Sequence, residues 1–324
     1  MYSFSQLNEI VANSFLNLKF ENDPKNLYEP ISYILSIGGK RIRPILVLAG
    51  CNVFSDDIEL AINPSVAVEI FHNFTLVHDD IMDNASIRRG QETVHQKWDN
   101  NIAILSGDAM TILAYQKLAT VSPKYLPQVL NVFSSFALGI CEGQQYDMDF
   151  ESRSNVTRDE YLKMIELKTS ILLKGALEIG AVIGGASQHD IDKIGEFGRC
   201  LGMAFQLQDD LLDTFGDVNT FGKKIGGDIV ANKKTILTIE TLKLLDSKSA
   251  EIFSNTMADF SMNRDEKISR ITDMYYQVSV QIIVEDLIKD YFHSAINALE
   301  SISMSKERKV VLYDIADRLL KRNN

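Results

Sequence analysis

Two acidic clusters with the same internal spacing interrupt apolar stretches of this chain and restrict how it can fold. The first lies in "FTLVHDDIMDNASIRRG" and the second in "QLQDDLLD". Their carboxylates are Asp79, Asp80 and Asp83 in the first cluster, and Asp209, Asp210 and Asp213 in the second. Like charges at neighbouring helix positions repel by roughly 0.2–0.5 kcal/mol per pair, and by more in an enclosed site. Such helices therefore need cations close to their acidic faces.

The shared spacing points to a particular cation. In a helix, the first and last aspartates of each cluster lie on one face, and the middle one lies about 100° around. If the two helices face each other, up to six carboxylates converge. Clustered oxygen ligands suit Mg²⁺, which keeps several waters and bridges carboxylates to substrate phosphates. A solvated helix face explains one copy well, but two copies among apolar residues favour magnesium bound with a phosphorylated substrate.

Other uses of clustered carboxylates fit the pattern less well. The spacing of an EF-hand loop is missing, which makes a Ca²⁺ site less favoured. Glycoside hydrolysis needs a pair of carboxylates and does not need three on each side.

Most of the chain has a helical pattern of apolar residues. It contains only six prolines, and alternating strand patterns with tight-turn dipeptides are essentially missing. "YEPISYILSIGG" ends in a glycine pair suited to stopping a helix, and Pro44 suits the first turn of the next one. Thr157 and Glu160 have capping-box spacing at the start of another helix.

Two C-terminal segments, about 265–300 and 305–322, are also amphipathic. The least regular long stretch is "GDVNTFGKKIGGDIVANKKT", rich in Gly and Lys, and it is predicted to be a mobile loop. Because neither a repeat nor a low-complexity linker divides the chain, we expect a single all-α domain over residues 1–324.

Composition excludes several classes of partner. A net charge of −11 repels nucleic acid and anionic membranes, so an anionic substrate would need metal ions or clustered Lys and Arg.

"ILLKGALEIGAVIGGA" is broken by Lys174 and Glu178 and is too short to span a bilayer. No secretory signal is visible, and Cys51, Cys141 and Cys200 lack metal-ligand spacing. We expect reduced thiols, a cytoplasmic location, no nucleic acid and no stable membrane insertion.

Basic residues occur where an anionic substrate would need them. "GGKRIRP" supplies Lys40, Arg41 and Arg43 beside glycines that allow close backbone approach, and Arg88 and Arg89 follow the first acidic cluster. Arginine can bind phosphate oxygens with two parallel hydrogen bonds. Further candidates are Lys168, which precedes Thr169 on a predicted helix, Lys223 and Lys224 in the loop, and Lys233. Each alone is more readily a surface charge, but together they indicate two anion sites beside a metal centre.

His72 precedes Asp79 by two helical turns and shares its helix face. A lone histidine is usually a structural hydrogen-bonding group, and only this alignment favours a place at the site. His78 has no comparable alignment.

In their order along the chain, these motifs resemble the trans-isoprenyl diphosphate synthases, the polyprenyl synthetase family. The matching segments cover nearly the whole chain: "GGKRIRP", "HNFTLVHDDIMDNASIRRG", "GDAM", "GQQYD", "YLKMIELKTS", "GMAFQLQDDLLD" and "GKKIGGDIVANKKT". The resemblance implies the isoprenoid synthase type I fold, an antiparallel helical bundle around a deep central cavity, and usually a homodimer. It also implies isopentenyl diphosphate and an allylic diphosphate (dimethylallyl, geranyl or farnesyl) as substrates.

The resemblance assigns roles residue by residue. Asp79 and Asp83 would be direct Mg²⁺ ligands supported by Asp80, and Asp209 would bind a further Mg²⁺, with three ions present when substrate is bound. Asp210 and Asp213 would lie close to that ion. The allylic diphosphate would contact Arg88, Lys168, Lys224 and Lys233, with Lys223 a rival in the loop. The isopentenyl diphosphate site would use Lys40, Arg43, His72 and Arg89. Thr169 and Gln206 would face the reacting carbons, and Gln144 and Asp147 would lie nearer the metal cluster.

The implied chemistry agrees with these residue types. Metal ions and cationic side chains neutralise the leaving diphosphate, so that the allylic C–O bond can ionise. The double bond of isopentenyl diphosphate, held nearby, attacks the cation. Loss of a proton, which the departing diphosphate can accept, restores an alkene.

Phe74 is the candidate for setting product length. In the family, an aromatic residue five positions before the first aspartate restricts elongation; here Thr75 beside it is small, and "DDIMD" has no insertion. This combination favours a geranylgeranyl product slightly over a farnesyl product. Ordinary core packing is the alternative for Phe74.

Two other functions are consistent with parts of the pattern. A class I terpene cyclase shares the fold and the first aspartate motif, but it would have an Asn/Ser/Glu metal motif in place of the second cluster. A non-catalytic subunit of a heteromeric synthase commonly loses one aspartate motif. Since both clusters are intact, a prenyltransferase is the favoured function.

Overall fold

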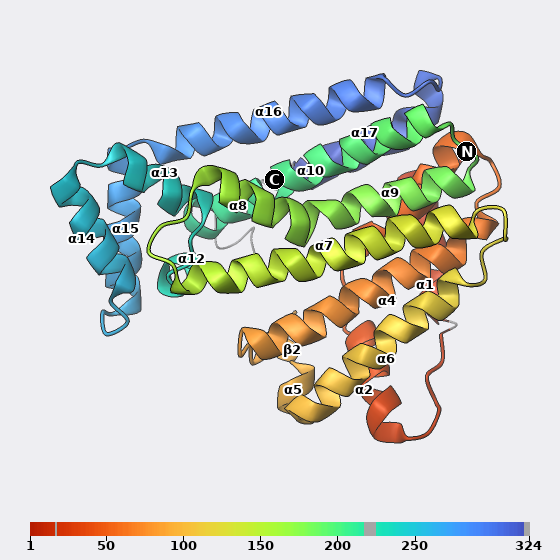
Figure 1. Cartoon of the computed structure of the whole chain (residues 1–324), viewed down its shortest axis with the longest axis horizontal. Coiled ribbons are helices and arrows are strands. Elements are labelled where there is room, and N and C mark those ends of the chain that lie inside the picture. Colours follow the sequence, from red (N-terminus) through yellow and green to blue (C-terminus); the bar gives the residue numbers. More distant parts are fainter. Residues whose placement is uncertain (17, 217–224, 321–324) are drawn as a thin grey trace. The chain divides into compact units, whose positions relative to one another are not determined.

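The computed structural model describes residues 1–16, 18–216 and 225–320 and is built almost entirely of helices (Figure 1). The only strands among these residues are β1 (Ile87–Arg88) and β2 (Gln91–Glu92), which pair antiparallel. The all-α fold class is therefore confirmed.

The described residues divide into two compact units. Unit 1 takes those within 1–134, 175–194 and 303–311, and unit 2 takes those within 135–174 and 195–302 and from 312 onward. Helices with residues in both units are α7 (Leu126–Ser152), α9 (Ile171–Ile183), α10 (Gln188–Phe215) and α17 (Lys306–Leu320). A single domain with a cavity enclosed by its helices stays a prediction.

Unit 1 is organised around α4. Its helices are α1 (Phe4–Leu16), α2 (Lys25–Ser36), α3 (Ile42–Phe54), α4 (Glu59–Met82), α5 (Val94–Lys97) and α6 (Asn100–Leu118). Helix α4 packs against α1, α3 and α6, and the middle of the helix is buried from Val66 to Asn73. By length and composition alone α4 could cross a membrane, but 67% of its most apolar window is buried within the protein. It is therefore the core helix of this unit, consistent with a soluble protein.

Unit 2 combines longer helices with a group of short ones. Its elements are α8 (Arg158–Ile165), the π-helix η1 (Glu166–Ser170), α12 (Gly227–Val230), α13 (Ile236–Leu244), α14 (Ser247–Ala258), α15 (Arg264–Gln277) and α16 (Val280–Glu300). The core of this unit includes Tyr161, Met203, Leu207, Phe253 and Tyr275. It thus joins α8 and the middle of α10 to the helices that follow.

Several predicted helix ends are confirmed. Thr157 and Glu160 form the capping box: the Glu160 amide donates to Thr157 Oγ1 at 3.3 Å, and the Thr157 amide donates to Glu160 Oε2 at 2.8 Å. Helix α2 ends before Gly38 and Gly39, whose φ angles of 78° and 146° favour glycine. These local signals determine where the helices begin and end.

Two details differ from the sequence prediction. Segment 265–300 is two helices, because Ser279, between α15 and α16, has a φ of 53°, which no continuous helix can contain. The Gly- and Lys-rich loop contains the short helix α12 near its C-terminal end. Residues 217–224 of that loop lie outside the described residues.

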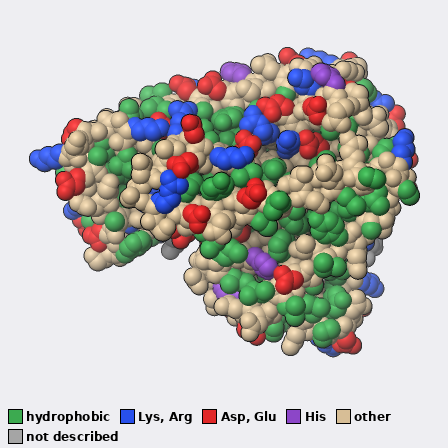
Figure 2. Space-filling view, in the orientation of Figure 1, with side chains coloured by type: hydrophobic (Ala, Val, Ile, Leu, Met, Phe, Trp, Pro, Cys, Tyr) green, Lys and Arg blue, Asp and Glu red, His purple; other side chains and the backbone are tan. Residues whose placement is uncertain are grey.

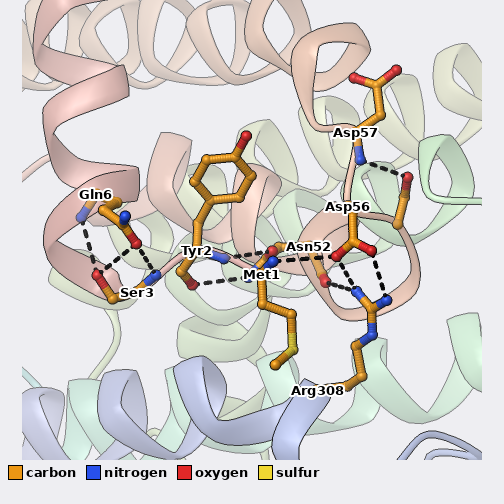
Figure 3. Close-up of polar contacts among 9 residues, drawn as sticks. Met1, Tyr2, Ser3, Gln6, Asn52, Asp56, Asp57 and Arg308 are labelled. Carbon is orange, nitrogen blue, oxygen red and sulfur yellow. Dashed lines mark hydrogen bonds and ion pairs between the residues drawn. The ribbon is translucent and has the colours of Figure 1, made fainter.

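The first residues of the chain are joined to the C-terminal end of α3 and to the loop that follows it (Figure 3). Asn52 and Tyr2 exchange two hydrogen bonds of 3.0 Å. Asp56 accepts from the Met1 ammonium at 3.2 Å and from Arg308 Nη1, near the start of α17, at 2.8 Å. Since Asp56 is exposed, its ion pairs contribute little stability, and the main effect of the network is to fix the position of this end.

Glycines let α3 and α9 approach each other closely in unit 1. A Cβ atom at Gly180 would lie 2.1 Å from the Val47 carbonyl oxygen and 2.8 Å from the Cys51 amide nitrogen. A Cβ at Gly50 would lie 2.5 Å from the Leu177 carbonyl oxygen. The two backbones are therefore in direct contact, with no room for a side chain.

We expect Gly180→Ala to lower the free energy of unfolding by about 2 kcal/mol, because the new methyl group would force two backbones apart. Chemical denaturation monitored by circular dichroism measures this. Gly139→Ala is the matched control, since its Cβ would meet only side-chain atoms, with Ile171 Cδ1 at 2.8 Å and Leu167 Cδ2 at 3.4 Å. Equal stability of the two variants would contradict this account of the α3–α9 contact.

Candidate active site

The first aspartate cluster lies at the C-terminal end of α4. Asp79 is half-buried, Asp80 is only 1% exposed, and Asp83 is exposed at the residue that follows the helix. The Asp83 amide still donates to the Asp79 carbonyl at 2.8 Å. Asp79 and Asp83 are thus the members of this cluster that reach solvent.

The middle aspartate of this cluster is paired with Arg88. Arg88 Nε lies 2.8 Å from both carboxylate oxygens of Asp80, and Arg88 Nη2 lies 2.7 Å from Oδ1. Arg88 is on β1, so the short β-ribbon after α4 turns back over the helix end. Because a buried carboxylate requires a partner, this ion pair fixes the helix end and the ribbon together.

His72 is buried on α4 and carries no charge near neutral pH. Burial lowers the pKa of its imidazole well below the usual value, and the positive charges of Arg43, Arg89 and Arg88 lower it further. A neutral imidazole can both donate and accept a hydrogen bond. Its predicted place beside the arginines is therefore consistent with the structure.

A buried acid, Glu69, lies near two of these arginines, Arg43 and Arg89. Burial raises the pKa of its carboxyl group, while the charge of Arg43 and a 3.2 Å hydrogen bond from Asn73 Nδ2 oppose that rise. Glu69 is not among the residues that the sequence predicts for the site. Its sequence signal is an acid within the apolar run "SVAVEIF" of a helix.

The glycine-flanked basic motif meets Arg89. Arg89 has a φ of 52°, and its Nη1 donates to the Gly38 carbonyl. A Cβ at Gly39 would lie 2.7 Å from the same nitrogen. Lys40 is exposed and Arg43 is half-buried. Unit 1 therefore brings the "GGKRIRP" turn and Arg89 together, as the predicted anion site requires.

The second aspartate cluster lies on α10, and here too the middle residue is more deeply buried than the outer two. Asp209 and Asp213 are half-buried, whereas Asp210 is 5% exposed. Tyr161 donates its hydroxyl proton to Asp210 Oδ2, and Gln206 Nε2 donates to Oδ1 at 3.1 Å. Burial raises the pKa of Asp210, as does the charge of Asp228, while both hydrogen bonds oppose the rise.

The hydrogen bonds continue from Asp210 to the π-helix. Thr169 Oγ1 donates to Gln206 Oε1 at 3.0 Å. Thr169 and Lys168 lie in η1, where the chain makes one wider turn between α8 and α9. The sequence predicts a helix here but not its wider turn.

Lys168 Nζ forms an ion pair of 2.6 Å with Asp147 Oδ2, in the "GQQYD" segment of α7. Two glycines admit the wider turn: a Cβ at Gly143 would lie 2.4 Å from the Lys168 amide nitrogen, and one at Gly202 would lie 2.6 Å from Ser170 Cα. The glycines of "GQQYD" and "GMAFQ" are therefore required by packing against η1. Gln144, next to Gly143, is buried.

Asp213 is held by backbone groups at the start of α12. The Asp228 amide donates to Asp213 Oδ2 at 2.9 Å, and the Gly226 amide donates to the Asp213 carbonyl at 2.6 Å. Lys233 is exposed just after α12, with its amide bonded to the Asp228 carbonyl at 2.9 Å. Lys223 and Lys224 lie outside the described residues.

Phe74 is half-buried on α4, and its ring centroid lies 5.3 Å from that of Phe71 and 4.8 Å from that of His78. It lines a mainly apolar hollow of about 540 Å³ together with Leu27, Leu105, Asp108, Ala109, Thr111 and Ile112. Thr75 Oγ1 donates to the His72 carbonyl at 2.8 Å. Phe74 therefore contacts both the core of unit 1 and a hollow that opens beside α6.

The donor sets of the two clusters are suited to Mg²⁺ but do not form a preassembled cage. In the described part of the chain, no group of three or more His, Cys, Asp or Glu side chains is arranged to hold a metal. In each cluster the middle carboxylate is already engaged within the protein. The outer carboxylates offer hard oxygen ligands, which suits an ion that keeps waters and is also held by substrate phosphates.

Comparison with known proteins agrees with the motifs. The family model described as "Polyprenyl synthetase" matches residues 24–275. A geranylgeranyl diphosphate synthase of Sulfolobus acidocaldarius is 36% identical over 313 residues, covering 94% of each chain. A crystal structure of a geranylgeranyl pyrophosphate synthase has a TM-score of 0.95 at 41% identity over 100% of both chains. The synthetase from Pyrococcus horikoshii has a TM-score of 0.91 at 33% identity over 98% of each chain.

We expect the imidazole of His72 to remain neutral at pH 6, although an unperturbed histidine is largely protonated there, with a pKa of about 6.5. The unfolded chain would take up this proton below about pH 6.5 and the folded chain would not, so the residue lowers stability as pH falls from there. A nuclear magnetic resonance titration of the His72 ring signal measures its pKa. The signal is assigned by its absence from the spectrum of His72→Gln. A midpoint between pH 6 and 7 would contradict the expected burial.

Proposed function

Because the chain belongs to the polyprenyl synthetase family, we propose that it condenses isopentenyl diphosphate with an allylic diphosphate to give geranylgeranyl diphosphate. The observation that carries this proposal is the shared construction of the two aspartate clusters. Each has a buried middle carboxylate engaged within the protein and outer carboxylates that reach solvent. The comparisons give no support to a terpene cyclase or a non-catalytic subunit.

Magnesium is the proposed cofactor, with three ions bound when substrate is present. Asp79 and Asp83 would be direct Mg²⁺ ligands, and Asp209 would bind a further ion. Asp80, Asp210 and Asp213 would support them. When bound, Mg²⁺ neutralises the charge that develops on the leaving diphosphate.

The cationic side chains divide between two proposed diphosphate sites. Lys40, Arg43 and Arg89, beside the neutral His72, would bind isopentenyl diphosphate. The contact between Arg89 and the Gly38 turn supports this group. Arg88, Lys168, Lys233 and one or both loop lysines, Lys223 and Lys224, would contact the allylic diphosphate.

The chain's own residues would perform three tasks in the reaction. Arginine and lysine side chains stabilise the negative charge that collects on the leaving diphosphate oxygens. The two diphosphate sites hold the reacting carbons close and oriented. Thr169 and Gln206 would face the allylic carbons, where oxygen atoms can stabilise the positive charge of the ionised chain.

Phe74 supports a short-chain product. A growing chain that starts at the first aspartate cluster would extend along α4 toward residues one and two turns earlier. Phe74 occupies that region, and the hollow beside it is mainly apolar. We propose geranylgeranyl rather than farnesyl diphosphate as the main product.

A homodimer of single-domain subunits in the cytoplasm is the proposed state of the protein. Helix α6 exposes Ile104, Leu105 and Ile112, and Figure 2 shows hydrophobic side chains gathered over this helix. Apolar residues at this spacing form one face of a helix, which a second subunit could cover.

Incubation of the purified protein with Mg²⁺, isopentenyl diphosphate and each allylic diphosphate in turn tests the activity. We expect longer prenyl diphosphates, mainly geranylgeranyl diphosphate, and loss of turnover in excess EDTA that added Mg²⁺ restores. Product analysis by mass spectrometry distinguishes the alternatives. A hydrocarbon would indicate a cyclase, and no turnover with any primer would contradict the proposed reaction.

We expect Phe74→Ala to lengthen the main product by at least one isoprene unit, because removing the ring joins the chain-end region to the apolar hollow beside α6. Mass spectrometry of the products measures the shift. Phe71→Leu is the control, since Phe71 is fully buried and does not line the hollow. An unchanged product distribution in Phe74→Ala would remove Phe74 as the residue that limits product length.

A further inference from the structure

Tyr161 has a hydroxyl group in the interior of unit 2 that the proposed chemistry does not use. The side chain is 2% exposed and lies on α8 among core residues that include Met164, Met203 and Leu207. A buried hydroxyl without a partner destabilises the folded state. Here the partner is Asp210 Oδ2, on the second aspartate cluster.

The bond to Tyr161 completes the set of donors around Asp210. Tyr161 donates to one carboxylate oxygen and Gln206 Nε2 to the other. In both bonds the Asp210 oxygen is the acceptor. With both oxygens engaged, Asp210 is held in one rotamer and acts as the fixed acceptor at the end of a chain of hydrogen bonds.

This chain has a definite direction. Because Gln206 presents its amide nitrogen to Asp210, its carbonyl oxygen faces Thr169, whose hydroxyl donates to it at 3.0 Å. The only hydroxyl proton of Thr169 is thereby used, and the lone pairs of Oγ1 are left to face elsewhere. Oxygen lone pairs, unlike a hydroxyl proton, stabilise a neighbouring positive charge.

We propose that Tyr161 is a positioning residue for prenyl transfer: by fixing Asp210 it sets the orientation of the Gln206 amide and, through it, of the Thr169 hydroxyl. This inference rests on the proposed function, since it requires an allylic cation near Thr169. Without the tyrosine hydroxyl, Asp210 Oδ2 becomes a buried acceptor that has lost this hydrogen-bond donor. The carboxylate can then rotate, and the Gln206 amide can turn over and offer its nitrogen to Thr169.

The wider turn of η1 makes Thr169 dependent on this bond. Lys168 in the same turn is held by Asp147 on α7, at 2.6 Å, and Gly143 and Gly202 fix the backbone on both sides. The backbone is thus set by packing, whereas the Thr169 hydroxyl is set by Gln206. Loss of the Tyr161 hydroxyl should therefore alter the chemical step more than substrate binding.

Tyr161→Phe tests the inference in the full-length enzyme with Mg²⁺, isopentenyl diphosphate and the best allylic primer. We expect kcat to fall about 10- to 100-fold, as misorientation of reacting groups commonly causes. We expect the KM of each substrate and the Mg²⁺ concentration for half-maximal activity to stay within about threefold.

Tyr275→Phe is the matched control. Tyr275 is 1% exposed in the same core, and its hydroxyl lies 3.1 Å from Thr238 Oγ1, outside the aspartate cluster. This variant loses a comparable buried hydrogen bond and should keep the wild-type kcat. Circular dichroism melting of both variants checks that each is folded at the assay temperature.

A double-mutant cycle with Thr169→Val separates positioning from general loosening of the core. If Tyr161 acts through Thr169, the double variant should be no slower than Thr169→Val alone. The inference would be overturned if the losses of kcat multiplied in the double variant. It would also be overturned by a wild-type kcat in Tyr161→Phe, or by an equal loss of kcat in Tyr275→Phe. An inactive wild-type enzyme would instead reject the proposed function, and the inference with it.

Discussion

A carboxylate on the buried side of a helix needs a partner inside the protein, and both aspartate clusters meet this need at their middle residue. Asp80 binds the guanidinium of Arg88, and Asp210 binds Tyr161 and Gln206. These contacts let the clusters lie beside buried apolar residues without leaving a buried carboxyl group unsatisfied. They also hold the backbone that carries the outer aspartates. The outer aspartates of α4 and α10 therefore depend on interactions that the middle aspartates make inside the protein.

Glycines set the distances between backbones, as the contacts above hold the buried carboxyl groups. The contacts of Gly180 with α3 and of Gly143 with η1 leave no space for a methyl group. Direct contact between backbones fixes the distance between helices more closely than contact between flexible side chains, because few atoms can adjust. In unit 2 this keeps Lys168 and Thr169 at a set depth beside α10. A small number of hydrogen bonds is then enough to orient the polar side chains on this backbone.

Much of this organisation follows from local sequence rules. The glycine pair after α2 and the Thr157 capping box are short-range signals, and the repeated aspartate spacing identifies α4 and α10 as the helices of interest. Other features depend on residues distant in the sequence. Whether Arg88 binds Asp80 or a substrate, and whether Tyr161 is ordinary core, depends on which helices pack together. The break at Ser279 likewise follows from the packing of α15 and α16, since "YYQVSVQ" contains neither Gly nor Pro. Glu69 is similar: the sequence shows an acid in an apolar run, but only the fold shows that arginines lie beside it.

The π-helix η1 has a consequence for how this region can vary. One wider turn holds one residue more than an α-helix would over the same length, so it behaves as a single-residue insertion within the segment from α8 to α9. Removing one residue from the turn would restore regular α-helix over the same length, so the residues of α8 and α9 would keep the faces that they present now. The change would fall on η1 itself, where Lys168 and Thr169 lie, because one of its five residues would be lost. The wider turn therefore changes which side chains this short segment presents beside α10 without changing the register of the helices on either side of it.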